Sequence, residues 1–306
     1  MPEGDTIRRL ADDVRRRFMD QTVQSSIFRH PRYANADLSG RQLIDVDARG
    51  KNLLMRFDDG RTVHIHLKLQ GKVVFGKPTR GAEWRQRIDL HFERGRMVGI
   101  DLPVLNILKS RDEHQIIGHL GPDLCGDYDH ELAVQRIASM PDWPIAQAML
   151  DQRLVAGFGN IYAVETPFIV GLSPFTPVGK IDRLSELIAI GAALIRTNAR
   201  FGPQNTVGRR LDTSLHWVLN RNIRVCRVCR SAVKRYADRD TPWQRRSAAC
   251  VSCQQPENES VDLDRAASLL SLHPCRRLVD LKSGTLTAAV NAPVETMPQR
   301  RTQNFW

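Results

Sequence analysis

The spacing of four cysteines near residue 240 constrains this chain more than any other feature. Cys226, Cys229, Cys250 and Cys253 form the pattern C-x2-C-x20-C-x2-C. Two such pairs can place four thiolates tetrahedrally around one Zn²⁺, and four sulfur ligands leave no open position for a substrate. The pattern predicts one structural zinc ion holding a small β-hairpin, with a redox pair or a chance spacing as the alternatives.

The zinc motif lies in the most basic part of the sequence. Residues 196–246 contain thirteen Lys or Arg residues and three Asp or Glu residues, and the whole chain of 306 residues carries a formal charge of +11. Concentrated positive charge favours a polyanionic partner, usually nucleic acid. A basic surface without a specific partner, or a zinc ribbon that makes only protein contacts, would give the same pattern.

Hydropathy and the first residues indicate the compartment. No apolar run is long enough to span a bilayer, and the charged start MPEGDT is unlike a secretory signal. Cysteines of a cytoplasmic protein are more often metal ligands than disulfides. We therefore expect a monomer in the cytoplasm, associated with the nucleoid, with no membrane contact.

The first 120 residues read as one helix followed by many short strands. Ile7, Leu10, Val14 and Phe18 recur at helical spacing, so residues 5–18 predict a helix, with Asp5 and Thr6 suited to its cap. Residues 63–69, 87–92 and 97–100 alternate as strands do. A β-sandwich or barrel with the helix at one side follows, which makes the N-terminal part of an α+β chain.

The pattern changes to helices after residues 119–131, which read as an interdomain linker. Helices are predicted over residues 146–155, 160–165, 184–200 and 263–272, with the sequence GFG at 157–159 breaking the first from the second. The expected domains are 1–120, a linker at 121–140, a helical domain at 141–220, a zinc finger at 221–255 and an extension at 256–306. The part beyond Gly284 is expected to be disordered.

The N-terminus carries unusual chemistry. Pro2 is small enough for removal of the initiator methionine, which would expose a secondary amine. An α-amine has a pKa near 8 and is partly neutral at physiological pH, so it can attack a sugar C1′ and form an iminium. The neighbouring Glu3 can move protons to and from the opened sugar.

Four segments together resemble the formamidopyrimidine-DNA glycosylase/endonuclease VIII family. They are MPEGDT, RGKNLL (49–54), LDQRLVAGFGNIYAVE (150–165) and the four-cysteine finger that closes on Cys-Gln, in that order over residues 1–254. The start is most similar to the endonuclease VIII branch and its actinobacterial members. The resemblance implies an N-terminal β-sandwich with flanking helices, a helix–two-turn–helix DNA-binding domain and a C-terminal zinc finger.

The resemblance also implies roles for individual residues. Pro2 matches the Schiff-base nucleophile and Glu3 the catalytic acid/base, while Lys51 and Asn160 match residues that hold phosphates near the lesion. Arg245 matches the finger arginine that binds the phosphate beside the flipped nucleotide, with Arg246 as the adjacent candidate. From the residues alone, a solvated surface lysine is the favoured interpretation of Lys51, and a plain helix cap is the alternative for Asn160.

Two further positions are implied in the same way. An enzyme of this kind takes a damaged nucleotide out of the stack. Leu69 and Gln70 align with the loop that fills the gap, with Leu69 as the wedge, although Leu69 also continues the strand alternation into a core position. Glu165 matches a glutamate of the second helix and either organises the active site or is a buried structural carboxylate.

The finger departs from the family pattern. Ala248-Ala249 stands where relatives carry an aromatic pair, and Leu219-Asn220-Arg221 replaces Tyr-Gly-Arg. These changes put the packing of the finger and the register of Arg245 in question, but not Pro2 and Glu3. The resemblance implies a bifunctional glycosylase and AP lyase that acts on oxidised bases, pyrimidines above all, in double-stranded DNA. The alternatives are a non-catalytic or lyase-only DNA-binding relative and, more remotely, a zinc-ribbon transcription or RNA factor.

Overall fold

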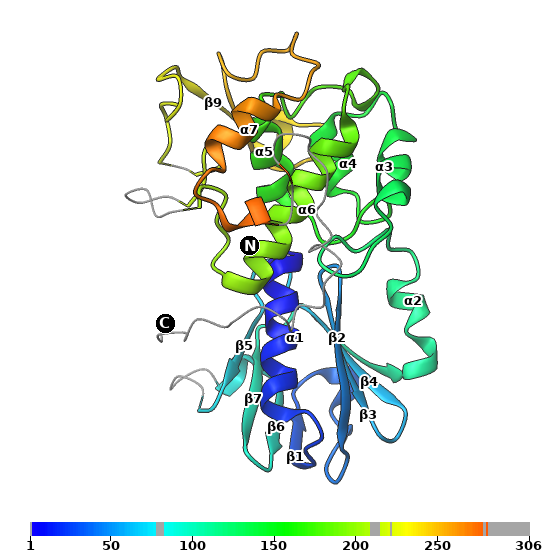
Figure 1. Cartoon of the computed structure of the whole chain (residues 1–306). Helices are drawn as coiled ribbons and strands as arrows, with labels where there is room; N and C mark the ends of the chain where they lie inside the picture. Colours follow the sequence, from blue (N-terminus) through cyan, green and yellow to red (C-terminus); the bar gives the residue numbers. More distant parts are fainter. Residues whose placement is uncertain (1, 78–82, 209–214, 221, 278–279, 281–306) are drawn as a thin grey trace.

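The chain folds into two lobes that share one long helix. The computed structural model describes residues 2–77, 83–208, 215–220, 222–277 and 280. Helix α1 (Gly4–Phe18) runs along the sheets of the first lobe, and its N-terminal end reaches the helices of the second (Figure 1). Each lobe has its own hydrophobic core. Because α1 contacts both β2 and α6, the start of this helix lies where the two lobes meet (Figure 1).

Helix α1 buries the apolar face that its sequence predicts. Ile7, Val14 and Phe18 are almost fully buried, and Phe18 stacks on Phe92 with ring centroids 4.5 Å apart. The expected cap was wrong by two residues. Glu3 is the N-cap, because its backbone is extended while its carbonyl accepts the first helical bonds.

The first lobe is a sandwich of two antiparallel four-stranded sheets, as predicted. One sheet has the order β1-β6-β7-β5 and the other β2-β3-β4-β8. The strands are β1 (Val23–Phe28), β2 (Leu43–Arg49), β3 (Asn52–Phe57), β4 (Arg61–His66), β5 (Lys72–Phe75), β6 (Gln86–Phe92), β7 (Gly95–Ile100) and β8 (Val104–Lys109). Side chains from both sheets and from α1 form its core.

The second lobe is helical. Its helices are α3 (His130–Ala138), α4 (Ile145–Leu150), α5 (Asn160–Ile169) and α6 (Leu184–Phe201), and the short α2 (His114–Ile117) precedes it. Single 3-10 turns are η1 (Pro31–Tyr33), η2 (Glu83–Arg85), η3 (Ser110–Asp112), η4 (Val178–Lys180), η5 (Asp238–Asp240) and η6 (Pro274–Arg277). The turns at 151–159 between α4 and α5 make the helix–two-turn–helix unit.

Two predictions about the helical lobe need correction, one of a helix end and one of a linker. The helix expected over residues 146–155 ends at Leu150, because the Asp151 carboxylate accepts the backbone N–H of Arg153 and offers the chain a turn in place of another helical bond. The segment expected as a linker, 121–140, contains α3. Asp129 caps α3 by accepting the N–H of Leu132, and Ile137 is buried in the second core.

The C-terminal part adds the finger and one more helix to the second lobe. Strands β9 (Val233–Tyr236) and β10 (Ser247–Cys250) form the predicted hairpin, and α7 (Leu263–Leu269) is the helix expected over residues 263–272. The part expected to be disordered, beyond Gly284, lies outside the described residues. Among the described helices, none is both long and apolar enough to cross a membrane.

Candidate active site

Glu3 is held at the junction of the lobes by the first turn of α5. Its two carboxylate oxygens accept the backbone N–H groups of Gly159 and Ile161, each at 2.9 Å, and the side chain is fully buried. A helix N-terminus offers unpaired N–H groups and the positive end of the helix dipole, so it favours a carboxylate. The group that occupies this helix N-terminus is therefore the carboxyl of Glu3 itself.

Glycines allow the two segments to approach so closely. A Cβ atom on Gly159 would lie 2.4 Å from Cδ of Glu3, and one on Gly4 would lie 2.7 Å from Cα of Gly157. The N–H of Gly4 also donates to the carbonyl of Gly157 at 2.9 Å. The sequences Pro-Glu-Gly and Gly-Phe-Gly thus fit each other, and they set Pro2 beside this contact.

Lys51 faces Glu3 from the turn between β2 and β3. Burial raises the pKa of Glu3 to about 7, although the charge of Lys51 lowers it. Burial lowers the pKa of Lys51 to about 8, which the Glu3 carboxylate partly offsets. Lys51 is therefore no freely solvated surface lysine, and both groups can exchange protons near neutral pH.

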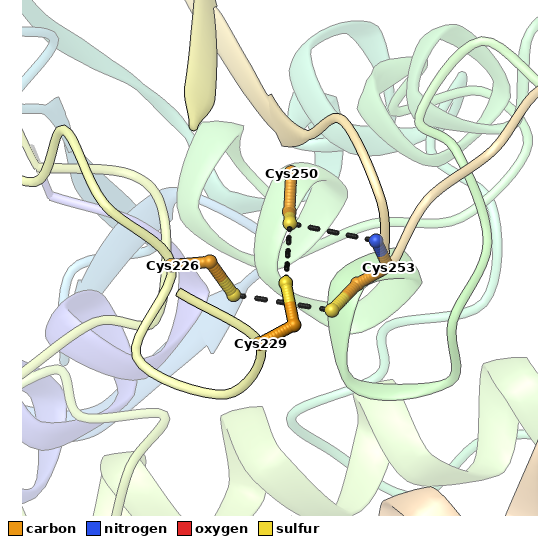
Figure 2. Close-up of side chains that lie close together, drawn as sticks. All are labelled: Cys226, Cys229, Cys250 and Cys253. Atoms are coloured by element: carbon orange, nitrogen blue, oxygen red, sulfur yellow. Dashed lines mark hydrogen bonds between the residues drawn. The ribbon is translucent and has the colours of Figure 1, made fainter. Parts of the chain in front are cut away.

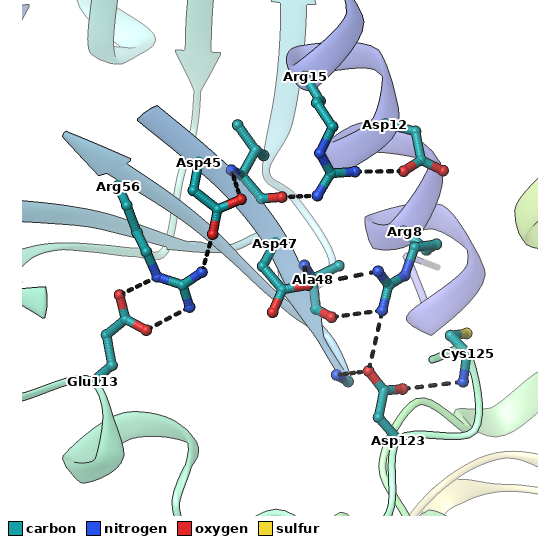
Figure 3. Close-up of polar contacts among 12 residues, drawn as sticks. Arg8, Asp12, Arg15, Asp45, Asp47, Ala48, Arg56, Glu113, Asp123 and Cys125 are labelled. Atoms are coloured by element: carbon teal, nitrogen blue, oxygen red, sulfur yellow. Dashed lines mark hydrogen bonds and ion pairs between the residues drawn. The ribbon is translucent and has the colours of Figure 1, made fainter. Parts of the chain in front are cut away.

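The turn that carries Lys51 is fixed from the second lobe. Gly50 has a φ of +57° and donates its N–H to Oδ2 of Asp123 at 3.0 Å. Oδ1 of Asp123 accepts the N–H of Cys125, and Arg8 of α1 lies 3.8 Å from Oδ2 (Figure 3). A buried carboxylate thereby locks β2, α1 and the chain between the lobes together around Lys51.

The finger brings Arg245 close to this group. The positive charge of Arg245 contributes to the lowered pKa of Lys51, while the Arg245 side chain itself is exposed. Its backbone N–H and carbonyl both bond to Oγ1 of Thr241. Arg246 has a different environment, since its guanidinium lies 3.8 Å from Asp238 at the surface.

Asn160 connects the finger to α5. Its Nδ2 donates to the carbonyl of Arg246 at 2.8 Å, whereas its Oδ1 is buried without a hydrogen-bond partner in the structure. The expected free N–H groups at this helix start are not free, since Glu3 occupies those of Gly159 and Ile161. Gly159 is the N-cap of α5, so Asn160 is not a helix cap; its side chain holds the chain just before β10 beside the site.

The segment after β4 leaves the sheet. Lys68 has a φ of +48°, and its N–H donates to Nδ1 of His66, so the strand alternation stops before Leu69. Leu69 is 66% exposed, which rules out the core position that the alternation allows. Gly71 closes the turn by donating to the carbonyl of Leu67 at 2.8 Å, leaving Leu69 and Gln70 at its tip.

Sequence reasoning missed His66 and Asp5. Burial lowers the pKa of His66 to about 4, helped by the charges of Lys68 and Lys51, so His66 belongs to the same cluster. The sequence signal for His66 was the strand alternation of residues 63–69, which places His64 and His66 on the same face of the strand. Asp5 was assigned to a helix cap, yet it is fully buried and bonded to Tyr162.

Glu165 serves the backbone of the second lobe. The carboxylate accepts the N–H groups of Trp217, Val218 and Leu219 and the hydroxyl of Thr206, at 2.6–2.9 Å. It is fully buried in α5. Of the two roles expected for Glu165, these contacts describe the structural one, since they tie the chain before the finger to α5.

The four predicted cysteines meet at one point. Their sulfur atoms all lie within 4.8 Å of one another, with Cys226 Sγ 3.9 Å from Cys253 Sγ and Cys229 Sγ 3.4 Å from Cys250 Sγ (Figure 2). Tetrahedral zinc with Zn–S bonds of about 2.3 Å requires sulfur separations of about 3.8 Å. The cluster could hold one metal ion.

Aromatic residues support the finger from another position. Phe175 packs against Tyr236 and Trp243, with ring centroids 4.7 and 5.1 Å apart. The small Ala248 and Ala249 are buried in β10. The finger therefore packs on the helical lobe without the aromatic pair that the family pattern places before the third cysteine.

Known proteins are similar to this chain over most of its length. Residues 1–101 match the family model of the formamidopyrimidine-DNA glycosylase N-terminal domain. The chain is 37% identical over 261 residues to "Probable endonuclease 8 2" of Streptomyces coelicolor, covering 83% of this chain and 94% of that protein. It is 35% identical over 257 residues to "DNA-(apurinic or apyrimidinic site) lyase Nei2" of Mycolicibacterium smegmatis, covering 83% of this chain and 99% of that protein.

Solved structures agree on the fold. A Lactococcus lactis formamidopyrimidine-DNA glycosylase bound to DNA with an abasic site has a TM-score of 0.69 at 18% identity, covering 83% of this chain and 99% of that one. The chain belongs to the formamidopyrimidine-DNA glycosylase/endonuclease VIII family. Within the family it groups with the actinobacterial endonuclease 8 proteins, at 33–37% identity.

Proposed function

We propose that the chain is a DNA glycosylase with AP-lyase activity, which removes oxidised bases, pyrimidines above all, from double-stranded DNA in base excision repair. The observation that carries the proposal is the buried Glu3. It is adjacent to Pro2, seated on α5 and has a pKa raised by burial to about 7, so it can hold and release a proton near neutral pH.

The reaction starts at the amine of Pro2, once the preceding methionine is removed. The nitrogen lone pair bonds to C1′ as the C1′–N bond to the base breaks, and the base leaves with the bonding electrons and takes up a proton. The nitrogen then loses its own proton. As the C1′–O4′ bond opens, O4′ takes a proton from Glu3 and the nitrogen lone pair closes the iminium.

The iminium acts as an electron sink for strand cleavage. Loss of a proton from C2′ breaks the C3′–O bond and releases the 3′ phosphate, which is β-elimination. Loss of a proton from C4′ then breaks the C5′–O bond and releases the 5′ phosphate, which is δ-elimination. Water hydrolyses the imine and restores the free amine, while the carboxyl of Glu3 regains its proton from solvent.

The residues around Glu3 would bind the DNA backbone. Lys51, Asn160 and Arg245 surround Glu3 on three separate elements, and each offers donors to phosphate oxygens. The exposed Leu69, with Gln70 beside it, would enter the duplex where the damaged nucleotide is turned out. Arg246, paired with Asp238 at the surface, is the weaker phosphate ligand of the two finger arginines.

We also propose that the ion of the finger is a single structural Zn²⁺ held by Cys226, Cys229, Cys250 and Cys253. Zinc would supply no chemistry to the reaction, because four thiolates fill its coordination shell. Its task is to hold the hairpin that carries Arg245. We expect a monomer that acts on the nucleoid in the cytoplasm.

One specific observation favours a second candidate, an enzyme with lyase activity only. The Mycolicibacterium smegmatis relative is named as an apurinic or apyrimidinic site lyase. Such an enzyme would use Pro2 and Glu3 on abasic sites without releasing a base.

Borohydride trapping separates these candidates. The wild-type chain should form a covalent adduct with duplex DNA that contains an abasic site or an oxidised pyrimidine, and should release the oxidised base. Pro2→Gly and a form that retains Met1 should form none, while the matched control Pro31→Gly, in the outer turn η1, should trap normally. Trapping only on abasic DNA would favour the lyase, and binding without trapping would refute both enzymes.

A further inference from the structure

Asp5 is a second buried carboxylate beside Glu3, and the proposed reaction does not use it. It lies in the first turn of α1 and is fully shielded from solvent. Its Oδ2 accepts the hydroxyl of Tyr162 at 3.1 Å, and its Oδ1 accepts Nε2 of Gln204 at 2.9 Å. A buried carboxylate with partners from α5 and from the chain after α6 is costly unless those partners stabilise its charge.

The hydrogen bonds around Asp5 favour its ionised form. Nδ2 of Asn198 donates to the Tyr162 hydroxyl oxygen at 2.8 Å, so the hydroxyl hydrogen is free to point at Asp5. Burial raises the pKa of Asp5, whereas the amide of Gln204, which donates to it, and the positive charge of Arg9 lower it and so favour the anion. Both oxygens of Asp5 thus accept hydrogen bonds, and the amide nitrogen of Gln204 cannot accept one in return.

Asp5 and Glu3 both accept hydrogen bonds from the first turn of α5. Glu3 binds the N–H groups of Gly159 and Ile161, and Asp5 binds the next side chain, Tyr162. Two buried carboxylates that repel each other do not ionise together easily. The donors and the cation of Arg9 stabilise the charge of Asp5, and this charge raises the pKa of Glu3, so the proton is held on Glu3.

Lys51 works in the opposite direction. Burial raises the pKa of Glu3, the ammonium of Lys51 lowers it, and the charge of Asp5 counters Lys51 by raising it. Cys125 and Tyr162 also face Asp5, but burial raises the pKa of both groups well above their usual range, so they stay neutral. Beyond Lys51, the positive charges of Lys68 and Arg245 and the ring of His66, neutral because its pKa is lowered to about 4, complete the surroundings.

We propose that Asp5 is a positioning residue of the active site, which keeps a proton on Glu3 at neutral pH through its own fixed negative charge. The proposal rests on the proposed function, because the proton on Glu3 matters when O4′ of the sugar leaves C1′. Asp5 touches neither DNA nor the reacting atoms. The hydrogen bonds of Tyr162, Asn198 and Gln204 stabilise the ionised carboxylate of Asp5.

The test is the titration of Glu3 in the full chain. With ¹³C-labelled glutamate side chains, the carboxyl signal that disappears in Glu3→Gln reports Glu3. In Asp5→Asn this signal should titrate about one pH unit lower than in the wild type, because the repelling charge is gone. Asp13→Asn removes a charge from the outer face of the same helix and should leave the signal unchanged.

Gln204→Met gives an independent variant should Asp5→Asn fold poorly. Without its amide donor, Asp5 holds its own proton more tightly, so Glu3 should again titrate lower, by a smaller amount. The high-pH limb of the trapping rate on abasic DNA should move to lower pH in both variants.

An unchanged Glu3 titration in both variants, or a shift to higher pH, overturns the role of Asp5. Absence of trapping by the wild-type chain would instead refute the proposed function. The carboxyl titration needs no activity, so the two failures are distinguishable.

Discussion

Glu3 makes the stability of the whole fold depend on pH through one side chain. Burial raises its pKa from 4.5 to about 7, so the folded chain keeps a proton that the unfolded chain releases. The stabilisation is fully present below pH 4.5 and is lost as pH rises through 7. Lys51, whose pKa is lowered to about 8, changes its contribution only at higher pH.

We therefore predict a pH-dependent difference between the wild type and Glu3→Gln. The free energy of unfolding of the wild type, relative to the variant, should fall by about 3 kcal/mol between pH 4.5 and 8. Urea unfolding at a series of pH values measures this difference. A difference that stays constant across the range would contradict the raised pKa.

Gly159 tests how closely Glu3 must approach α5. Its backbone φ of −128° is open to any residue, so Gly159→Ala adds only the Cβ that would lie 2.4 Å from Cδ of Glu3. We expect a loss of about 1–3 kcal/mol in unfolding free energy. We also expect trapping on abasic DNA to fall roughly a hundredfold, because the carboxyl moves out of place.

The control for this variant is Gly40→Asn. Gly40 has a φ of +77°, which asparagine tolerates, and no atom lies within 4 Å of its added Cβ. It should trap like the wild type. Gly159→Ala with full activity would mean that the contact between Glu3 and α5 is not needed for the reaction.

At the scale of elements, the sequence predicts what periodicity and metal spacing determine. Helices α1 and α6, strands β4, β6 and β7 and the four-cysteine cluster follow directly from such patterns. The end of α4 does not, because it depends on the Asp151 side chain competing with the helix. The end of β4 depends in the same way on a positive φ at Lys68.

The residues of the candidate site differ in the same way in how far the sequence predicts them. Pro2, Glu3, Lys51 and Arg245 were predicted from motifs that resemble the family, whereas the proposed role of Asp5 depends on Gln204, which lies 199 residues further along the chain. No local pattern contains a contact of that separation. The aromatic cluster of Phe175 with the finger was missed for the same reason, since the family pattern places aromatics elsewhere.

The finger should fail as one element when its metal is removed. We predict one zinc ion per chain by elemental analysis. A chelator should remove it and loosen β9 and β10, which pair through only four residues each. Affinity for abasic duplex DNA, measured by fluorescence anisotropy, should then fall at least tenfold, because Arg245 loses its position.

Two variants frame this experiment. Cys253→Ser should lose zinc and bind DNA as weakly as the stripped protein. Cys275→Ala, in the separate turn η6, should keep both its zinc and its affinity. Full DNA affinity without the metal would show that the metal-bound finger is not required for DNA binding.

Across the whole molecule, the extension after the finger returns to the helical lobe and braces the chain near the site. The carboxylate of Asp262 caps α7, and its backbone N–H donates to the carbonyl of Val170. Further along, Nε2 of His273 donates to the carbonyl of Asn205 at 3.0 Å. Asn205 follows Gln204, so the extension and Asp5 both hold the same loop.

His273 can hold this loop because it stays neutral. Burial lowers its pKa to about 4, so the ring keeps a hydrogen on Nε2 for Asn205 while Nδ1 accepts the N–H of Cys275. The stabilisation is present above the usual histidine pKa of 6.5 and is lost as pH falls through 4. At neutral pH, the hydrogen bond to the loop is therefore fully formed.

We predict that His273→Leu loosens residues 202–208 without undocking α7. The carbonyl of Asn205 keeps its second donor, Nδ2 of Asn198 at 2.9 Å, so the loss should be about 1–2 kcal/mol. Amide hydrogen exchange in the loop should then be roughly tenfold faster or more, since each 1.4 kcal/mol is a factor of ten. Exchange in the sandwich should not change.

The control is Leu272→Ala, because Leu272 is next in the chain but 60% exposed, and its removal should leave the loop as it was. If the loop exchanges at the wild-type rate in His273→Leu, its other contacts, including those of Asn198, Gln204 and Thr206, are sufficient to hold it, and the extension does not stabilise the loop. If the loop and α7 loosen together, the extension docks as a single unit. His273 would then stabilise the lobe as a whole, and the extension would have no separate stabilising effect on the loop that Asp5 contacts.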